Sequence, residues 1–257
     1  MDIREKVQTA AQLLSQADNI IAFTGSGISS ESGIPTFRGK DGLWKQFKAQ
    51  DLATPAAFST NPKLVWEWYD WRRNIIADKQ PNPGHKILAE WNDLFSSLYV
   101  ITQNIDGLHQ KAGSENIIEL HGNIWKLRCT KEGTVTEDHS CPLKEIPPIC
   151  KKCGALMRPH VVWFGESLDT KLLSEAVKMC SKADLMLAIG TSSLVYPAAS
   201  IPMTAAESGV KVIEINPEST PLTPRADTSI RGKAGDVLPE ISDILNNIIR
   251  QTKGREK

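Results

Sequence analysis

The chain has 257 residues, of which 40% are hydrophobic and 23% are charged, enough for one large domain or a large domain that carries a smaller one. Thirty basic residues balance thirty acidic ones, and no run of five or six like charges occurs, so the charge pattern of a nucleic-acid-binding protein is missing. Neither a secretory leader nor an apolar run of membrane-spanning length is seen, which predicts a cytoplasmic protein with no membrane contact.

Short apolar runs alternate with helical patterns along most of the chain. Residues from Ile3 to Leu14 show helical spacing, and residues 19–24 form a buried-strand pattern that ends in a glycine-rich turn. Further runs follow at 98–102, 117–120, 185–189 and 211–216. This alternation predicts an α/β fold with a Rossmann-like, doubly wound parallel sheet.

Two segments interrupt the alternation. Residues 38–78 are rich in tryptophan, and residues 122–160 hold four of the five cysteines. We expect a Rossmann-like domain of residues 1–37, 79–121 and 161–257, with a smaller inserted domain made of a helical module (38–78) and a zinc-ribbon-like module (122–160). In a reducing compartment, cysteines crowded in this way indicate a metal site rather than a disulfide framework.

The sequence TGSGIS at 24–29 comes directly after the first predicted strand. Glycines at such a position let backbone N–H groups approach a phosphate. The usual third glycine of a dinucleotide fingerprint is displaced, because Gly33 follows Gly27 by six residues instead of three. Taken alone, the motif therefore indicates either a phosphate-binding loop or a tight strand-to-helix turn.

Read onward through ESGIPTFRG (31–39), this loop resembles the cofactor-binding loop of sirtuins. Six further strings resemble the family in the family's order: TQNID (102–106), ELHG (119–122), VVWFGE (161–166), GTS (190–192), INP (215–217) and KAGD (233–236). The resemblance spans nearly the entire chain. It implies an enzyme that consumes NAD to remove acyl groups from lysines of protein or peptide substrates, producing nicotinamide and O-acyl-ADP-ribose.

The resemblance also implies roles for individual residues. His121 would be the catalytic base, a task that suits a neutral histidine, and Asn104 would also be catalytic. The acyl-lysine peptide would lie along Val161, Val162, Trp163, Phe164, Gly165 and Glu166. The NAD site would comprise Gly25, Ser26, Gly27, Glu31, Phe37, Arg38, Trp44, Gln103, Asn104, Ile105, Asp106, Gly190, Thr191, Ser192, Asn216, Pro217, Glu218 and Ala234.

Tyr69 and Arg72 are expected on one face of a helix that begins near Asn61. A phenol and a guanidinium together suit a carboxylate, which an acetyl group lacks. The pair is similar to the one in desuccinylase-type sirtuins, and Thr36 matches that branch too. The predicted substrates are therefore succinyl- and malonyl-lysine, with acetyl-lysine as a further candidate. The alternative is that the neighbouring aromatic residues only pack the helix while Arg72 and Arg73 are solvated surface.

Sirtuins carry two Cys-x-x-Cys pairs that hold a structural zinc ion, and here the first pair is incomplete. Cys150 and Cys153 form an intact pair, whereas Cys129 is followed at the matching position by Glu132. Cys141 is a substitute, which gives the predicted zinc ligands Cys129, Cys141, Cys150 and Cys153. Glu132 or His139 as a ligand, or loss of zinc, are the alternatives.

Other functions remain compatible with these residues. Within the family, the main activity would be lysine deacetylation or ADP-ribosyl transfer. Outside it, the chain would be an NAD-responsive binding protein without turnover, against which His121 and Asn104 argue, or a hydride-transferring dehydrogenase suggested by the glycine loop in a parallel sheet. A dehydrogenase would produce NADH, whereas a sirtuin releases nicotinamide.

Overall fold

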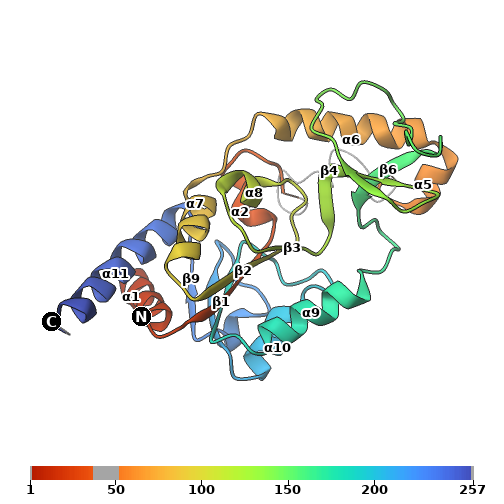
Figure 1. Ribbon diagram of the computed structural model, residues 1–257. Helices are drawn as coiled ribbons and strands as arrows, with labels where there is room; N and C mark the ends of the chain where they lie inside the picture. The colour runs from red at the N-terminus through yellow and green to blue at the C-terminus, as the bar shows by residue number, and fades with distance from the viewer. Residues whose placement is uncertain (1, 37–51, 256–257) are drawn as a thin grey trace.

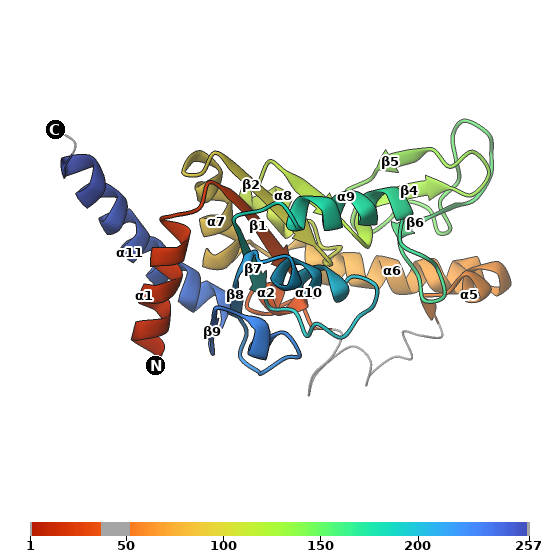
Figure 2. The ribbon, with the colours of Figure 1, turned by 90° about the horizontal axis from the view of Figure 1, so that it is seen from below.

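The computed structural model describes residues 2–36 and 52–255. Its main sheet has six parallel strands in the order β3-β2-β1-β7-β8-β9 (Figures 1 and 2). The strand order reverses between β1 and β7, because the chain builds outward first on one side and then on the other. The bounds are β1 (Asn19–Thr24), β2 (Ser97–Thr102), β3 (Ile117–Glu119), β7 (Leu185–Ile189), β8 (Lys211–Ile215) and β9 (Thr228–Ile230).

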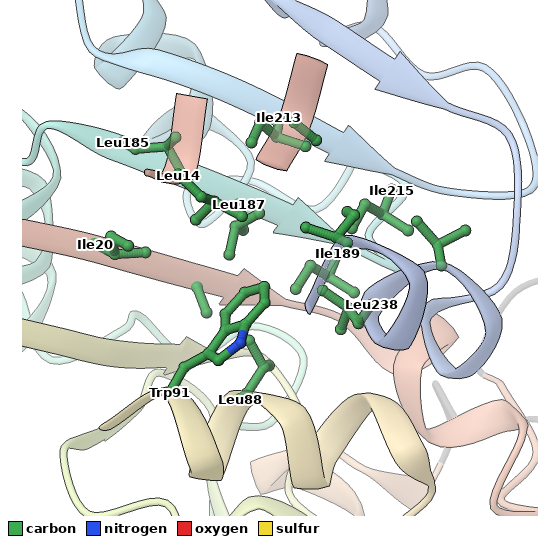
Figure 3. Close-up of a cluster of buried hydrophobic side chains, with 14 of the residues drawn as sticks. Leu14, Ile20, Leu88, Trp91, Leu185, Leu187, Ile189, Ile213, Ile215 and Leu238 are labelled. Atoms are coloured by element: carbon green, nitrogen blue, oxygen red, sulfur yellow. The ribbon is translucent and has the colours of Figure 1, made fainter. Parts of the chain in front are cut away.

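Helices cover both faces of this sheet. Ile20 and Ala22 of β1 point into one hydrophobic cluster, and Ile21 and Phe23 point into another, as strand alternation requires. The first cluster packs against α1 (Ile3–Leu14), α7 (Pro83–Glu90) and α11 (Ala234–Arg255), and Figure 3 shows part of it around Trp91. The second packs against α9 (Thr170–Cys180) and α10 (Ser200–Glu207). The predicted doubly wound α/β fold is confirmed.

A second, antiparallel sheet of order β5-β4-β6 lies with α5 and α6 at the end of the molecule away from α1 and α11 (Figures 1 and 2). Asn61 caps α6 by accepting from the Leu64 N–H at 3.0 Å, and proline follows at the first position. This end has its own hydrophobic core. The bounds are β4 (Gly122–Cys129), β5 (Val135–Glu137), β6 (Met157–Val161), α5 (Pro55–Thr60) and α6 (Pro62–Ala77).

Two polar side chains of α6 hold the loop after β5. Arg73 donates to the backbone carbonyls of Asp138 and Ser140, at 2.5 and 2.9 Å, and Asp70 accepts from the Leu143 N–H at 2.8 Å. The Arg73 side chain is 0% exposed, and Arg72 is 5% exposed. The alternative that both arginines are solvated surface is therefore wrong.

The remaining elements are short: α2 (Ser26–Ser30), α8 (Leu108–Ala112) and the 3-10 turns Trp91–Asp93 and Thr223–Arg225. The sequence pattern did not indicate β9, which has only three residues. Among the described helices, none combines the length and apolar character that crossing a bilayer requires.

Candidate active site

A cavity of about 680 Å³ lies at the carboxyl ends of β1, β2, β7 and β8, where the strand order reverses. Ligands of doubly wound sheets bind at this place because loops diverge there and leave a crevice. The cavity extends to α6 and the end of β6. Its walls include the sequence-predicted residues Gly25, Ser26, Gly27, Tyr69, Arg72, Gln103, Asn104, Ile105, His121, Val161, Val162, Trp163, Phe164, Gly165, Glu166, Gly190, Thr191, Ser192, Asn216, Pro217, Glu218 and Ala234.

Two described residues expected at the NAD site are not among those lining the cavity. Glu31 accepts a hydrogen bond from the Gly235 N–H at 3.0 Å, at the start of α11. Asp106 is buried and accepts from the Ser29 hydroxyl and the Leu108 N–H, each at 2.8 Å. Three further predicted NAD ligands, Phe37, Arg38 and Trp44, lie outside the described residues.

Gly25 and Gly27, in the loop after β1, allow this loop to pack closely against the loop after β7. The Gly25 N–H donates to the Ile189 carbonyl at 3.0 Å, and the Gly27 N–H donates to the Gly190 carbonyl at 2.8 Å. A Cβ atom on Gly27 would stand 2.6 Å from the Gly190 Cα atom. These two amides are thus engaged within the protein, and the tight-turn interpretation accounts for both glycines.

Polar groups next to this loop hold one another in place. The Asn104 side-chain amide donates to the Gly25 carbonyl at 3.0 Å and to the Ser29 hydroxyl at 3.1 Å. The Gln103 amide donates to the Thr191 hydroxyl at 2.9 Å, and thereby ties the loops after β2 and β7 together. Fixed amides at strand ends provide an array preorganised for a polar ligand.

Two buried histidines lie beneath this layer. The rings of His85 and His109 are 4.9 Å apart, and His109 Nε2 is 3.0 Å from the Thr24 hydroxyl. Burial lowers the pKa of His85 to about 4 and lowers that of His109 well below 6.5. Both rings are therefore neutral at physiological pH.

His121 lines the cavity where β3 passes into β4. Its Nδ1 atom lies 3.0 Å from the Gln103 carbonyl oxygen. A carbonyl only accepts, so Nδ1 carries the proton and Nε2 keeps its lone pair. Burial lowers the pKa of His121, while the hydrogen bond to Gln103 opposes this effect. The ring is thus a neutral base at physiological pH.

The segment after β6 forms an opposite wall of the cavity. The Val162 N–H donates to the His121 carbonyl at 3.0 Å, which brings this segment against the histidine. The Phe164 N–H donates to the Ala53 carbonyl at 2.9 Å, and the Phe164 side chain is 42% exposed. Beyond Val162 the chain turns, because the Glu166 N–H donates to the Trp163 carbonyl at 3.0 Å, and this turn forms an exposed rim of the cavity.

Tyr69 and Arg72 lie one helical turn apart on α6, and both line the cavity. The Arg72 guanidinium carbon is 5.0 Å from the centre of the Trp68 ring and 5.7 Å from that of Tyr69. Burial lowers the pKa of Arg72, while Tyr69 and Asp106 counteract this effect, and burial raises the pKa of Tyr69 to about 12. A buried cation and a protonated phenol thus line the cavity side by side on α6.

Other cavity residues were not predicted as site residues from the sequence. Most of them come from the loop after β7 and the loop after β8, and the others lie in or beside α2, α5, α6, α9 and α11. The sequence indicates Thr36 only as a residue that matches one sirtuin branch. The set is Ser30, Thr36, Ala53, Trp68, Leu168, Leu194, Val195, Tyr196, Pro197, Ser219, Thr220, Pro221 and Lys233.

Three of the four predicted zinc ligands come together. The Sγ atoms of Cys129, Cys150 and Cys153 lie within 4.8 Å of one another, the spacing that a shared metal ion requires. Cys141 is not in this group: Asp70 and Arg73 act electrostatically on its thiol, and they anchor its loop to α6. Glu132 donates its N–H to Cys129 Sγ at 3.4 Å, while its carboxylate pairs with Lys152 at 3.2 Å.

Comparisons with known proteins agree with this geometry. The model of the Sir2 family matches residues 25–197. The chain is 57% identical to an NAD-dependent protein deacylase of Aquifex aeolicus (strain VF5) over 227 residues, which are 88% of this chain and 95% of that protein. A Sir2 homologue solved in complex with NAD is 45% identical, with a TM-score of 0.87 over 96% of this chain and 95% of the other. A Sir2 protein solved with a p53 peptide and NAD⁺ is 31% identical, with a TM-score of 0.82 over 95% and 98% of the two chains. This chain belongs to the Sir2 family.

Proposed function

We propose that this protein is an NAD-dependent protein-lysine deacylase whose cavity favours acyl groups that end in a carboxylate, such as succinyl and malonyl. The deacylase activity is that of its Sir2-family relatives. One observation carries the acyl preference. Buried Arg72 and Tyr69 line the same cavity as His121, so a lysine acyl chain that reaches the histidine has a cation and a phenol beyond it.

The residues at the strand ends fit NAD. The cavity has room for a ligand of this size, and hydroxyl and amide groups of Ser26, Thr191 and Asn216 line it at the sheet's switch point. When bound, NAD would supply the ribose carbon that accepts the acyl oxygen and the ADP-ribose that carries the acyl group away. Gln103 and Asn104 would hold the ribose side, since their amides are already fixed by protein partners.

His121 would take the proton from a ribose hydroxyl. Its Nε2 atom is the acceptor, because Nδ1 donates to the Gln103 carbonyl and thereby fixes the tautomer. Burial favours the neutral ring, so the base is ready without a prior loss of a proton. The segment 161–166 would hold the substrate backbone beside this histidine.

Arg72 would bind the acyl carboxylate by charge-assisted hydrogen bonds, and Tyr69 would donate a further one. An acetyl group ends before this region and has no group to use it.

The direct test compares succinyl-lysine and acetyl-lysine forms of one peptide in the presence of NAD, by nicotinamide release and peptide mass. Arg72→Met should lower the succinyl-to-acetyl ratio of kcat/KM by about 100-fold. Arg73→Met is the matched control, because this neighbouring buried guanidinium points to Asp138 and Ser140 and should leave the ratio unchanged.

Other outcomes identify the other functions. Equal losses on both peptides for Arg72→Met would remove the acyl preference and leave a deacetylase. Nicotinamide release with ADP-ribose attached to the protein would indicate ADP-ribosyl transfer, and the appearance of NADH would indicate a dehydrogenase. If no acyl peptide is deacylated and no nicotinamide is released, the protein would be an NAD-responsive binding protein without turnover.

We also infer a structural zinc site at Cys129, Cys150 and Cys153. Three converging thiols are the chemistry that zinc selects, and they tie the β4–β5 turn to the segment before β6. Metal analysis of protein prepared without chelator should find about one zinc ion per chain. Glu132→Cys should slow the loss of zinc to a chelator, since a fourth thiolate would close the site; a zinc content near zero in both proteins would contradict the assignment.

A further inference from the structure

The hydroxyl of Tyr69 receives a hydrogen bond inside the protein. The indole Nε1 atom of Trp163 donates to the Tyr69 oxygen at 2.9 Å. Both side chains are nearly inaccessible to solvent, at 2% and 3% exposure, and both line the cavity. The bond joins α6 to the segment that follows β6, so it connects the acyl end of the cavity with its peptide-binding rim.

The direction of this bond follows from chemistry. An indole N–H is a donor only, so the Tyr69 oxygen must be the acceptor. The phenol proton then points away from Trp163, where it is available to another acceptor. Burial raises the pKa of Tyr69 to about 12, so the proton stays on the phenol throughout the physiological range.

Trp163 is itself held on three sides. Its backbone N–H donates to a Glu166 carboxylate oxygen at 2.9 Å. Arg158 donates to both oxygens of that carboxylate, at 2.5 and 2.8 Å, and its guanidinium carbon stands 3.5 Å from the centre of the Trp163 ring. The Phe58 ring packs 5.3 Å away. The indole therefore has little freedom to turn its N–H elsewhere.

We propose that Trp163 is a specificity-determining residue, because its indole N–H fixes Tyr69 as a hydrogen-bond donor toward the acyl end of the substrate. A phenol presented in this way matches an acyl group that ends in an acceptor, and a carboxylate is the strongest acceptor of this kind. Arg158 and Glu166 are positioning residues that act through Trp163. The inference rests on the proposed carboxylate preference and identifies what orients one of its two ligands.

The test is a double-mutant cycle with Trp163→Phe and Tyr69→Phe, on the same succinyl and acetyl peptides. Each single variant should lower the succinyl-to-acetyl ratio of kcat/KM by about tenfold, mostly through KM for the succinyl peptide. The double variant should lose little more than either single one, since both remove the same interaction. A ratio that Trp163→Phe leaves intact, or losses that multiply in the double variant, would overturn the proposal.

Trp68→Phe is the matched control. Trp68 also lines the cavity and packs edge-on against Tyr69 at 4.8 Å, but its indole N–H has no hydrogen-bond partner among the described residues. Trp68→Phe makes the same change of side chain as Trp163→Phe, leaves the Tyr69 bond in place and keeps an aromatic face for the Arg72 guanidinium, so the ratio should change much less than in Trp163→Phe. Equal losses from the two tryptophan variants would show that packing alone sets the ratio, and would overturn the role of the N–H.

A second measurement does not depend on the folding of Trp163→Phe. In protein labelled with ¹⁵N at tryptophan, Tyr69→Phe should shift the indole N–H resonance of Trp163 and leave that of Trp91 in place, since Trp91 bonds to Ser242 far from α6. An unmoved Trp163 resonance would overturn the bond. If Arg72→Met and Tyr69→Phe both leave the succinyl-to-acetyl ratio unchanged while the resonance shifts, the proposed acyl preference fails and the orienting bond stands.

Discussion

The strand-end side of the cavity and its α6 side hold their polar groups by different means. On the strand-end side, Gln103, Asn104 and His121 are each fixed by a hydrogen bond to the loops or backbone that continue the parallel strands. On the α6 side, Tyr69 and Arg72 are fixed by aromatic rings and by side chains. The polar groups on the strand-end side are positioned by the backbone where the strands end, so we expect substitutions there to be poorly tolerated. The polar groups on the α6 side are positioned by the side chains that pack around them, so we expect single substitutions there to change substrate specificity.

His121→Ala should show most clearly that the strand-end side of the cavity controls catalysis and the α6 side controls the choice of acyl group. Removing the base should lower kcat by about 10²- to 10⁴-fold on acetyl and succinyl peptides alike, because the acyl end is untouched. The measurement is steady-state product formation at saturating NAD. His139→Ala, which changes an exposed histidine, should retain full activity. A loss confined to one acyl peptide would contradict the division between the two sides.

The histidines beneath the strand ends predict a stability that depends on pH. His85 and His109 stay neutral in the folded protein but would be protonated below about pH 6.5 in the unfolded chain, so stability should fall with falling pH from that value toward the folded pKa, about 4 for His85. Between pH 7 and 5, each should contribute a loss of about 2 kcal/mol in the free energy of unfolding. Urea unfolding measures this change, and His85→Gln should reduce the slope by about half. A flat profile in the wild type would contradict the buried neutral pair.

Gly27→Ala tests whether loop packing limits change at the strand ends. The new methyl group would meet the Gly190 backbone, which has no flexible end to move, so we expect a loss of about 3 kcal/mol in stability together with weaker NAD binding. Thermal unfolding and calorimetric titration with NAD measure the two effects. Ser26→Ala, one position earlier, should change stability by less than about 1 kcal/mol. Equal behaviour of the two variants would mean that this contact between loops is not limiting.

Arg73→Met tests the α6 side. Its removal leaves the Asp138 and Ser140 carbonyls without their donor, so we expect a loss of about 2 kcal/mol in stability. Denaturant unfolding monitored by tryptophan fluorescence measures this loss. Activity on both acyl peptides should remain, because Arg73 does not line the cavity. Abolished catalysis in a folded Arg73→Met protein would show that the two sides are not separable.

The parallel sheet was predictable because β1, β2, β7 and β8 are mainly apolar runs of five or six residues, and short β3 lies in the apolar run 117–120. In contrast, β9 has three residues, two of them polar, and gives no such pattern. The strand-end loops carry strings long enough to be identified by resemblance. The positions of other residues depend on contacts distant in sequence. Arg73 is buried because the loop of Asp138 folds onto it, and the same anchoring separates Cys141 from the other cysteines. The spacing of residues in the sequence does not predict such contacts.

Both segments that complete the cavity leave the parallel sheet at the carboxyl ends of strands, one after β1 and the other after β3. They meet each other through α6, β4 and β6, and they have a hydrophobic core of their own. The parallel sheet therefore serves as a scaffold, and this end of the molecule is a separately packed unit attached to it. If both segments were transplanted together onto another sheet of this family, we expect the proposed acyl preference to move with them, whereas either segment alone would leave half of this core exposed.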